Sequence, residues 1–216
     1  MATETGKKIK KRFAVPYACY KLFTKRGSFI LDSGWVESIR TSTPCDRAGD
    51  PVPWMNYSMV DFVRERLNDS VDVFEFGSGY STCFFAKYCR SVTSVEYNPG
   101  WLARVRAMVP DNARVLQQHE DVDGDYCRSI AGQQRSFDLV VVDGRDRVNC
   151  VRQSVDHLTR GGVILLDDTE RERYRPAFDF LAGHGFRQLT LSGVKPGTPC
   201  RCQTTIFYRD GNCFGI

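Results

Sequence analysis

The feature that most constrains the fold is a series of five short apolar runs separated by longer amphipathic segments. The runs are rich in β-branched and aromatic residues and lie at 71–76, 91–96, 113–118, 137–143 and 162–168. Segments with helical spacing of apolar residues lie at 80–90, 99–108, 124–131, 147–158 and 170–183. Short apolar runs of this kind are typical of strands buried on both faces. The alternation predicts an α/β fold with a parallel sheet, right-handed crossovers and helices on both sides.

Two further runs, at 186–193 and 203–209, are joined by a loop rich in Gly, Pro and Cys. Because no helical segment separates them, they predict an antiparallel hairpin at the edge of the sheet. Residues 56–68 have the spacing of an amphipathic helix that leads into the first strand.

Residues 1–55 differ from the rest of the chain, because 13–55 hold four prolines and only short periodic pieces. We expect a tail and an extension that covers the strand ends, with one main domain at 56–216. The basic cluster at 7–12 could touch phospholipid or nucleic acid, but a solvated tail is the simpler interpretation.

Composition predicts a soluble cytoplasmic protein. The 216 residues are 42% hydrophobic and 26% charged, with a net charge of +4, and no apolar run approaches the ~20 residues of a membrane span. The basic start is not followed by the apolar segment of a secretory signal. Nine scattered cysteines suit reduced thiols, not a disulfide framework. We therefore expect no nucleic acid partner and no stable membrane association, while a homodimer is compatible with the sequence.

The stretch VFEFGSGYST, residues 73–82, places a glycine turn directly after the first predicted strand. Gly77 and Gly79 allow a sharp turn and a close approach of the backbone to a ligand. A dinucleotide fingerprint would carry a third glycine at position 82, where this chain has Thr82. The glycines therefore predict a nucleotide-type ligand other than a dinucleotide.

Two acids narrow the choice of ligand. Glu75 stands just ahead of the glycines, where its carboxylate would repel a diphosphate but attract an ammonium group. Glu96 ends the second predicted strand, where an acid can accept both ribose hydroxyls. Together they describe S-adenosylmethionine. The alternative is that Glu75 pairs with a structural arginine.

The motifs VFEFGSGYST, VTSVEYN, FDLVVVDG and LTRGGVILLDD resemble those of class I S-adenosylmethionine-dependent methyltransferases across residues 71–168. The resemblance implies a Rossmann-like, doubly wound sheet of seven strands, mostly parallel and with an antiparallel last strand. It also implies an adenine site near His119, Glu120 and Asp121. The cofactor-binding residues that we expect are Glu75, Gly77, Ser78, Gly79, Glu96, Asp121 and Asp143.

A closer resemblance is carried by PVPWMNYSMVDFV, DGRDRVNC and NCFGI. These stretches look like those of bacterial methyltransferases linked to surface-glycan pathways. The resemblance implies a small-molecule acceptor such as a sugar or a glycan precursor, and O-methylation as the reaction.

Three aspartates are expected to meet at the carboxyl ends of the strands: Asp143 after the fourth, and Asp167 and Asp168 after the fifth. Three carboxylates this close repel one another unless a cation neutralises them, and oxygen ligands suit Mg²⁺. Their positions are similar to the metal ligands of catechol, caffeoyl-CoA and macrolide-sugar O-methyltransferases. The resemblance implies a metal that binds two acceptor oxygens and lowers the pKa of one hydroxyl.

Asp146 stands where catechol-type enzymes carry a lysine. We take Asp143 and Asp146 as candidate catalytic residues, with Asp146 as a base; alternatively, Arg145 and Arg147 grip an anionic acceptor such as a uronate or phosphate. A purely structural interpretation is also open, in which Asp168 caps the following helix and pairs with one of these arginines.

Other functions of the same fold remain alternatives. Methyl transfer to protein or nucleic acid is one, although DGRD replaces the NPPY-type loop of many amino-group methyltransferases. A non-catalytic nucleotide-binding protein is another. An NAD-dependent oxidoreductase is disfavoured by Thr82.

Overall fold

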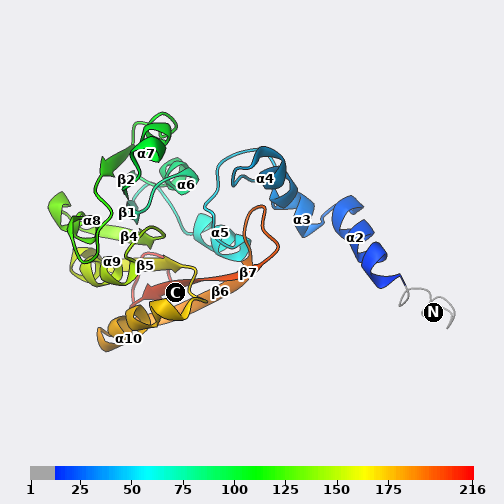
Figure 1. The fold of residues 1–216 in the computed structure, drawn as a ribbon. Helices are drawn as coiled ribbons and strands as arrows, with labels where there is room; N and C mark the ends of the chain where they lie inside the picture. Colours follow the sequence, from blue (N-terminus) through cyan, green and yellow to red (C-terminus); the bar gives the residue numbers. More distant parts are fainter. Residues whose placement is uncertain (1–12) are drawn as a thin grey trace.

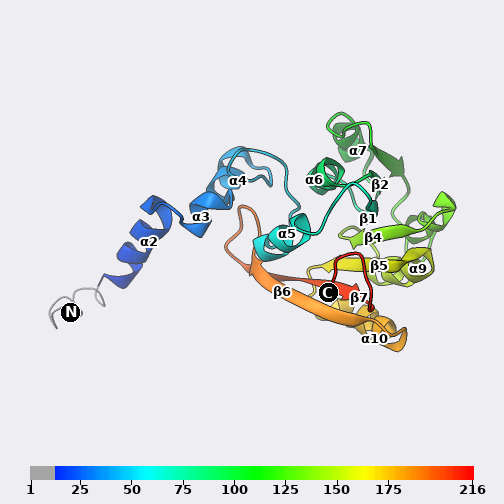
Figure 2. The same cartoon turned by 180° about the vertical axis from the view of Figure 1, so that it is seen from behind.

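A sheet of seven strands forms the centre of the protein (Figures 1 and 2). The structure is a computed structural model that describes residues 13–216. The strands lie in the order β3-β2-β1-β4-β5-β7-β6. Their bounds are β1 Asp72–Phe76, β2 Ser91–Glu96, β3 Ala113–Gln117, β4 Phe137–Val142, β5 Leu158–Asp167, β6 Arg187–Val194 and β7 Arg201–Tyr208.

The pairing of the strands confirms the predicted fold class. Neighbours from β3 to β5 pair in parallel, whereas β7 runs antiparallel to both β5 and β6. This is the mostly parallel Rossmann-like sheet with an antiparallel last strand. Because β6 lies beside β7 only, the closing hairpin forms one edge of the sheet, as expected.

The helices between the strands cover both faces of the sheet. They are α5 Tyr57–Arg64, α6 Tyr80–Tyr88, α7 Pro99–Arg106, α8 Asp125–Arg128, α9 Arg147–Ser154 and α10 Arg175–Gly183, with 3₁₀ turns η1 Ala131–Gln133, η2 Val155–His157 and η3 Glu172–Tyr174. The helix predicted at 170–183 is interrupted, because Pro176 has no N–H to bond to the carbonyl of Glu172. A 3₁₀ turn therefore precedes α10.

Two apolar clusters hold the layers together. α5 and α6 pack on one face, against side chains such as Val73 and Val141, and α8, α9 and α10 pack on the other, against Phe74 and Phe76. Successive side chains of a strand point to opposite faces. Glu75 therefore shares the face of Val73, under the start of α6, and only 1% of its surface is exposed.

Between residues 13 and 55, three short helices precede α5: α2 Ala14–Thr24, α3 Phe29–Asp32 and α4 Trp35–Thr41. α2 extends away from the sheet in both views, and none of its residues is buried (Figures 1 and 2). The segment next to it holds the β6–β7 loop, because Trp35 Nε1 donates to the carbonyl of Thr198 at 2.9 Å and Trp54 Nε1 to that of Pro196 at 3.1 Å. Within residues 13–216, no helix combines the length and apolar character needed to cross a bilayer.

Candidate active site

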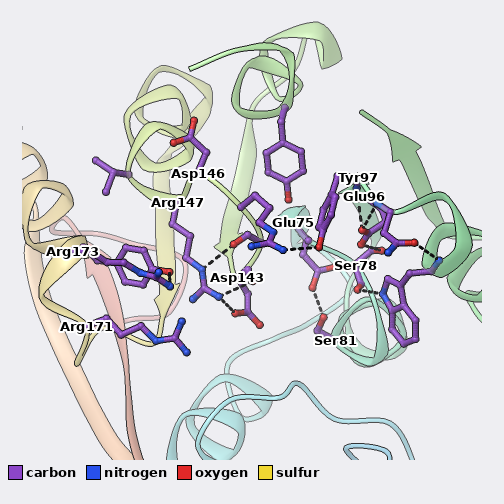
Figure 3. Close-up of a pocket in the computed structure, with 18 residues that line it drawn as sticks. Glu75, Ser78, Ser81, Glu96, Tyr97, Asp143, Asp146, Arg147, Arg171 and Arg173 are labelled. Atoms are coloured by element: carbon purple, nitrogen blue, oxygen red, sulfur yellow. Dashed lines mark hydrogen bonds and ion pairs between the residues drawn. The ribbon is translucent and has the colours of Figure 1, made fainter. Parts of the chain in front are cut away.

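A cavity of about 600 Å³ opens at the carboxyl ends of β1, β2 and β4 (Figure 3). Six of the predicted site residues line it: Glu75, Gly77, Ser78, Glu96, Asp143 and Asp146. The sheet brings them together because parallel strands present their carboxyl ends at one edge. Gly79, Asp121, Asp167 and Asp168 are not among the lining residues. None of residues 13–55 lines this cavity either, and the idea that they cover the active site stays a prediction.

Glu75 is held at the bottom of the cavity by hydroxyl groups instead of cations. Ser81 Oγ donates to Oε1, while Thr82 Oγ1 and Ser94 Oγ donate to Oε2 at 2.6 and 2.7 Å. A carboxylate offers about four lone-pair positions, so one position on Oε1 remains for a ligand. No lysine or arginine among residues 13–216 forms an ion pair with Glu75, which removes the alternative of a structural arginine. Burial raises the pKa of Glu75, and the three hydroxyl donors partly offset this.

Thr82 explains the missing third glycine of the turn. Its buried Oγ1 accepts the N–H of Gly79 at 3.0 Å and donates to Glu75, so that it caps α6 and fixes the acid at the same time. In the sequence, Thr82 is evidence only against a dinucleotide ligand. Its position three residues after Gly79 is the capping-box signal that could have revealed the second role.

Gly77 has φ +101° and lies against the loop after β4. A Cβ atom at Gly77 would come 3.2 Å from Gly144 N, and one at Gly79 would come 3.2 Å from the ring of Trp101. The glycines therefore allow close packing within the protein as well as an approach to a ligand. Trp101, which lines the cavity and was not predicted, donates from Nε1 to the carbonyl of Ser78 at 2.8 Å.

Glu96 faces the cavity from the end of β2, beside Tyr97. Its Oε1 accepts the N–H groups of Tyr97 and Asn98 at 3.0 and 2.8 Å, and its Oε2 accepts Ser78 Oγ at 2.9 Å. One lone-pair position on Oε2 is left, and the Ser78 hydroxyl can turn away to a ligand. This geometry suits a carboxylate that receives ribose hydroxyls, with the ring of Tyr97 as an aromatic wall next to it.

Asp121 and Asp146 are occupied by local contacts. Asp121 accepts the N–H groups of Asp125 and Tyr126 at 2.7 and 3.2 Å at the start of α8. Asp146, with φ +45°, accepts Asn149 Nδ2 at 2.9 Å on Oδ1 and the N–H of Asp123 at 2.8 Å on Oδ2. The adenine contact of Asp121 stays a prediction. Asp146 accepts a third hydrogen bond from Asn149 on Oδ2, which leaves about one lone-pair position, and its role as a base also stays a prediction.

Asp143, Asp167 and Asp168 meet as expected, with one carboxylate oxygen of each within 4.8 Å of the others. Asp143 is 26% exposed in its side chain and faces the cavity, whereas Asp167 is fully buried. Asp168, with φ +59°, turns back beside it. Oxygen donors at this spacing meet the chemical requirement for a hard divalent ion.

Three internal cations already neutralise this cluster. Arg147 pairs with Asp143 at 2.8 Å, Arg171 pairs with Asp168 at 2.8 Å, and Lys195 Nζ lies 2.6 Å from Asp167 Oδ2 and 2.5 Å from Asp168 Oδ1 (Figure 3 shows the first two arginines). Since Lys195 bridges two of the three acids, the arrangement does not fit a resident divalent ion. Lys195 was not predicted from the sequence.

The pKa values follow from this arrangement. Burial raises the pKa of Asp167 to about 7, helped by the charge of Asp143 and opposed by Lys195. Burial alone would raise the pKa of Asp168 too, but Lys195, Arg147 and Arg171 lower it overall. Burial also raises the pKa of Asp143 against the effect of Arg147, which makes this carboxylate a better proton acceptor than an exposed aspartate.

Comparisons with known proteins agree with the fold. Residues 74–169 match a family model described as a methyltransferase domain. No curated protein matches the chain in sequence.

Solved structures similar to the chain include a candidate caffeoyl-CoA O-methyltransferase from Staphylococcus aureus, with a TM-score of 0.56 and 13% identity over 93% of this chain and 99% of that one. The N-methyltransferase NodS from Bradyrhizobium japonicum WM9, in complex with S-adenosyl-L-homocysteine, has a TM-score of 0.53 and 16% identity over 83% and 100% of the two chains. Precorrin-6y C5,15-methyltransferase from Geobacter metallireducens GS-15 has a TM-score of 0.55 and 15% identity over 71% and 88%.

At these identities the structures share the fold with this chain, and their acceptors differ from one another. The matched family, the strand order and the predicted motif residues at one edge of the sheet agree with each other. Residues 74–169 therefore match a methyltransferase domain, and the sheet that carries them has the strand order typical of Rossmann-like methyltransferases.

Proposed function

We propose that the protein transfers the methyl group of S-adenosylmethionine to a hydroxyl oxygen of a small acceptor, such as a sugar or glycan precursor. The observation that carries the proposal is that Glu75, Glu96 and Asp143 line one cavity from three adjacent strands. Glu75 would bind the ammonium of the cofactor and Glu96 its ribose. Asp143 then lies on the side from which an acceptor would approach.

In the reaction, the acceptor oxygen attacks the methyl carbon, the carbon–sulfur bond breaks, and its electron pair stays on sulfur. S-adenosylhomocysteine is the product. The hydroxyl proton goes to Asp143, whose pKa is raised by burial. We assign this role to Asp143 and not to Asp146, because Asp146 already accepts three hydrogen bonds, whereas Arg147 is the one ion-pair partner of the Asp143 carboxylate among the described residues.

The cavity also supports an acceptor that carries an anionic group. Arg171 and Arg173 line it on the side opposite Glu75 and Glu96 (Figure 3), and Arg145 is a further lining residue. Arg173 donates to the hydroxyl of Tyr174 at 2.9 Å, and its guanidinium forms no ion pair among the described residues. A uronate or a phosphorylated sugar would match this charge.

The sequence resemblance implies a divalent ion that would supply Lewis-acid polarisation of the acceptor, but the ion-paired aspartates do not fit one. The proposed transfer does not depend on such an ion, because Asp143 can take the proton directly.

The test is release of S-adenosylhomocysteine with a panel of acceptors that compares neutral hexoses, uronates and sugar phosphates. Calorimetry with S-adenosylmethionine and with NAD on the same protein tests the cofactor separately. We expect saturable binding of S-adenosylmethionine only, and turnover with an anionic sugar that Asp143→Asn abolishes. Binding of NAD alone would refute the assignment of S-adenosylmethionine as the cofactor. Methylation of nitrogen in a protein or nucleic acid substrate would refute the proposal of a small hydroxylated acceptor.

A further inference from the structure

Lys195 is the first residue after β6, and its side chain reaches Asp167 and Asp168 at the end of β5. Its side chain is only 15% exposed, and Nζ lies within 2.6 Å of Asp167 and Asp168. An ion that bridged these two carboxylates would have to stand where this nitrogen stands.

The carboxylates that hold Lys195 are themselves fixed. Thr204 Oγ1 donates to Asp167 Oδ1 at 2.5 Å, and Asn56 Nδ2 donates to Thr204 Oγ1 at 3.0 Å. Asn56 also caps α5, so the chain of hydrogen bonds ends in a helix. The free oxygen of Asp167 is thereby aimed at Lys195.

The backbone that carries Lys195 is also held in place. The N–H of Thr198 bonds to the Lys195 carbonyl at 3.2 Å, and the carbonyls of Pro196 and Thr198 accept the indole N–H groups of Trp54 and Trp35. Withdrawal of the lysine would therefore disturb contacts with the N-terminal segment as well as two ion pairs.

The local charges make the lysine sufficient. When all three are ionised, Asp143, Asp167 and Asp168 carry three negative charges, which Arg147, Arg171 and Lys195 balance. A divalent ion added to this set would leave two uncompensated positive charges in a mostly buried site. Mg²⁺ would also have to lose water, which it does reluctantly.

We infer that Lys195 is the permanent cation of this cluster, that it occupies the position predicted for a divalent ion, and that the protein binds its cofactor and performs its chemistry without a metal. Lys195 then acts as a positioning residue: it holds Asp167 and Asp168 and leaves Asp143 facing the cavity.

Binding of Mn²⁺ alone, followed by electron paramagnetic resonance, tests this inference without any methyl transfer. The full-length protein is compared with Lys195→Met, which keeps the volume and removes the charge. Lys87→Met is the matched control, because Lys87 forms an exposed ion pair with Asp50 far from the cluster. We expect the wild type and the control to lack a saturable site, and Lys195→Met to gain one, with Mn²⁺ bound at least about a hundredfold more tightly.

Two results would overturn the inference. One is a saturable Mn²⁺ site in the wild type that is lost in Asp167→Asn. This measurement does not depend on the folding of a Lys195 variant. The other is a folded Lys195→Met protein that still binds no Mn²⁺. Since neither measurement involves an acceptor, the metal inference and the proposed O-methylation can fail independently.

A different observation concerns α2. Large apolar side chains on and next to this helix are exposed, among them Phe13 at 54%, Val15 at 73%, Tyr20 at 59% and Leu22 at 43%. The sequence from residue 7 to 26 contains eight basic residues and no acidic one: Lys7, Lys8, Lys10, Lys11, Arg12, Lys21, Lys25 and Arg26. Apolar and aromatic side chains mixed with basic ones are the composition of helices that lie in a membrane interface.

We propose that α2 docks onto an anionic lipid surface. Exposed apolar side chains and a polybasic segment together give the two signals that stable peripheral binding requires. The charge favours lipid over a second copy of the chain, because the docking segment contains no acid to pair with the basic residues of another arm. This proposal differs from the expectation of no stable membrane association.

Flotation of the full-length protein with vesicles tests it. We expect binding to phosphatidylcholine vesicles that contain phosphatidylglycerol, weaker binding at high salt, and none to phosphatidylcholine alone. Val15→Ser with Leu22→Ser should reduce binding at least about tenfold. Met108→Ser with Val122→Ser, which changes two exposed apolar residues elsewhere, should not. Absence of flotation, equal flotation of both double variants, or a dimer in light scattering that only Val15→Ser with Leu22→Ser dissociates would overturn the proposal.

Discussion

Replacement of Glu75 by Gln separates the role of this acid in cofactor binding from its role in the fold. The change keeps the shape of a side chain that is 1% exposed and removes its charge. A hydrogen bond between a carboxylate and an ammonium contributes about 1.5–3 kcal/mol. Glu75→Gln should therefore weaken the binding of S-adenosylhomocysteine about 10- to 150-fold.

The same substitution should not destabilise the protein. Burial raises the pKa of Glu75, so the folded state holds the ionised form at a cost that the neutral amide does not have. Three hydroxyl groups surround the carboxylate and can rotate to accept from the amide as well as donate to it. The midpoint of thermal unfolding should stay the same or rise.

Calorimetry with two ligands checks the reasoning. S-adenosylhomocysteine carries the ammonium, whereas 5′-methylthioadenosine keeps the adenosine and lacks the amino-acid portion. We expect Glu75→Gln to weaken the first ligand only. Glu65→Gln is the control, because Glu65 is an exposed acid paired with Arg66. Equal losses for both ligands, or no loss for either, would refute the proposed contact with the ammonium.

Three further substitutions test the structure around the site. Thr82→Val should lower the unfolding free energy by about 1–2 kcal/mol in urea denaturation, since it removes the cap and a donor to Glu75, whereas Thr82→Ser should keep both. Gly144→Ala should cost about 1–3 kcal/mol, because the new Cβ would overlap Tyr126 Oη, and adding Tyr126→Phe should restore part of the loss. Burial raises the pKa of Asp167 to about 7, so its contribution to the free energy of unfolding is present below the ordinary pKa of 3.8 and is lost as the pH rises toward 7. Asp167→Asn should therefore flatten the fall in the free energy of unfolding between these two pH values.

The sequence predicted the strands well because most of them are buried on both faces. DVFEF in β1 and FDLVVV in β4 carry the continuous apolar runs that such burial requires. The start of β5 was missed by four residues, since Thr159 and Arg160 are polar and partly exposed. They belong to the strand through backbone pairing near Phe137, which a hydrophobic pattern does not detect.

The site was predictable where the rule of strand ends was applied, and it was missed where it was not. Glu75, Glu96 and Asp143 follow from that rule. Both β5 and β6 run antiparallel to β7, so β6 is parallel to β5. Lys195 therefore also stands at the carboxyl end of a strand on the same side of the sheet. The hairpin was expected at the edge of the sheet, and nothing in its sequence indicates that Lys195 lies beside Asp167 and Asp168. Asp146 lines the cavity as predicted, but its contacts with Asn149 and with a loop N–H depend on local geometry that spacing does not reveal, and its role as a base stays a prediction.

The direction of the bound cofactor follows from the order of the strands. Glu96 ends β2, Glu75 lies on β1 and Asp143 follows β4, and these strands are consecutive neighbours. With strands about 4.8 Å apart, Glu96 and Asp143 are about 10 Å apart, and Glu75 lies between them. This spacing places the ribose of the cofactor beside Glu96 and its methyl group toward Asp143. Glu96→Gln should therefore weaken S-adenosylhomocysteine and 5′-methylthioadenosine alike, because both carry the ribose. If Glu96→Gln weakened only the ligand with an ammonium, the cofactor would lie in the reverse direction, and Asp143 would be too far from the methyl group to serve as the base.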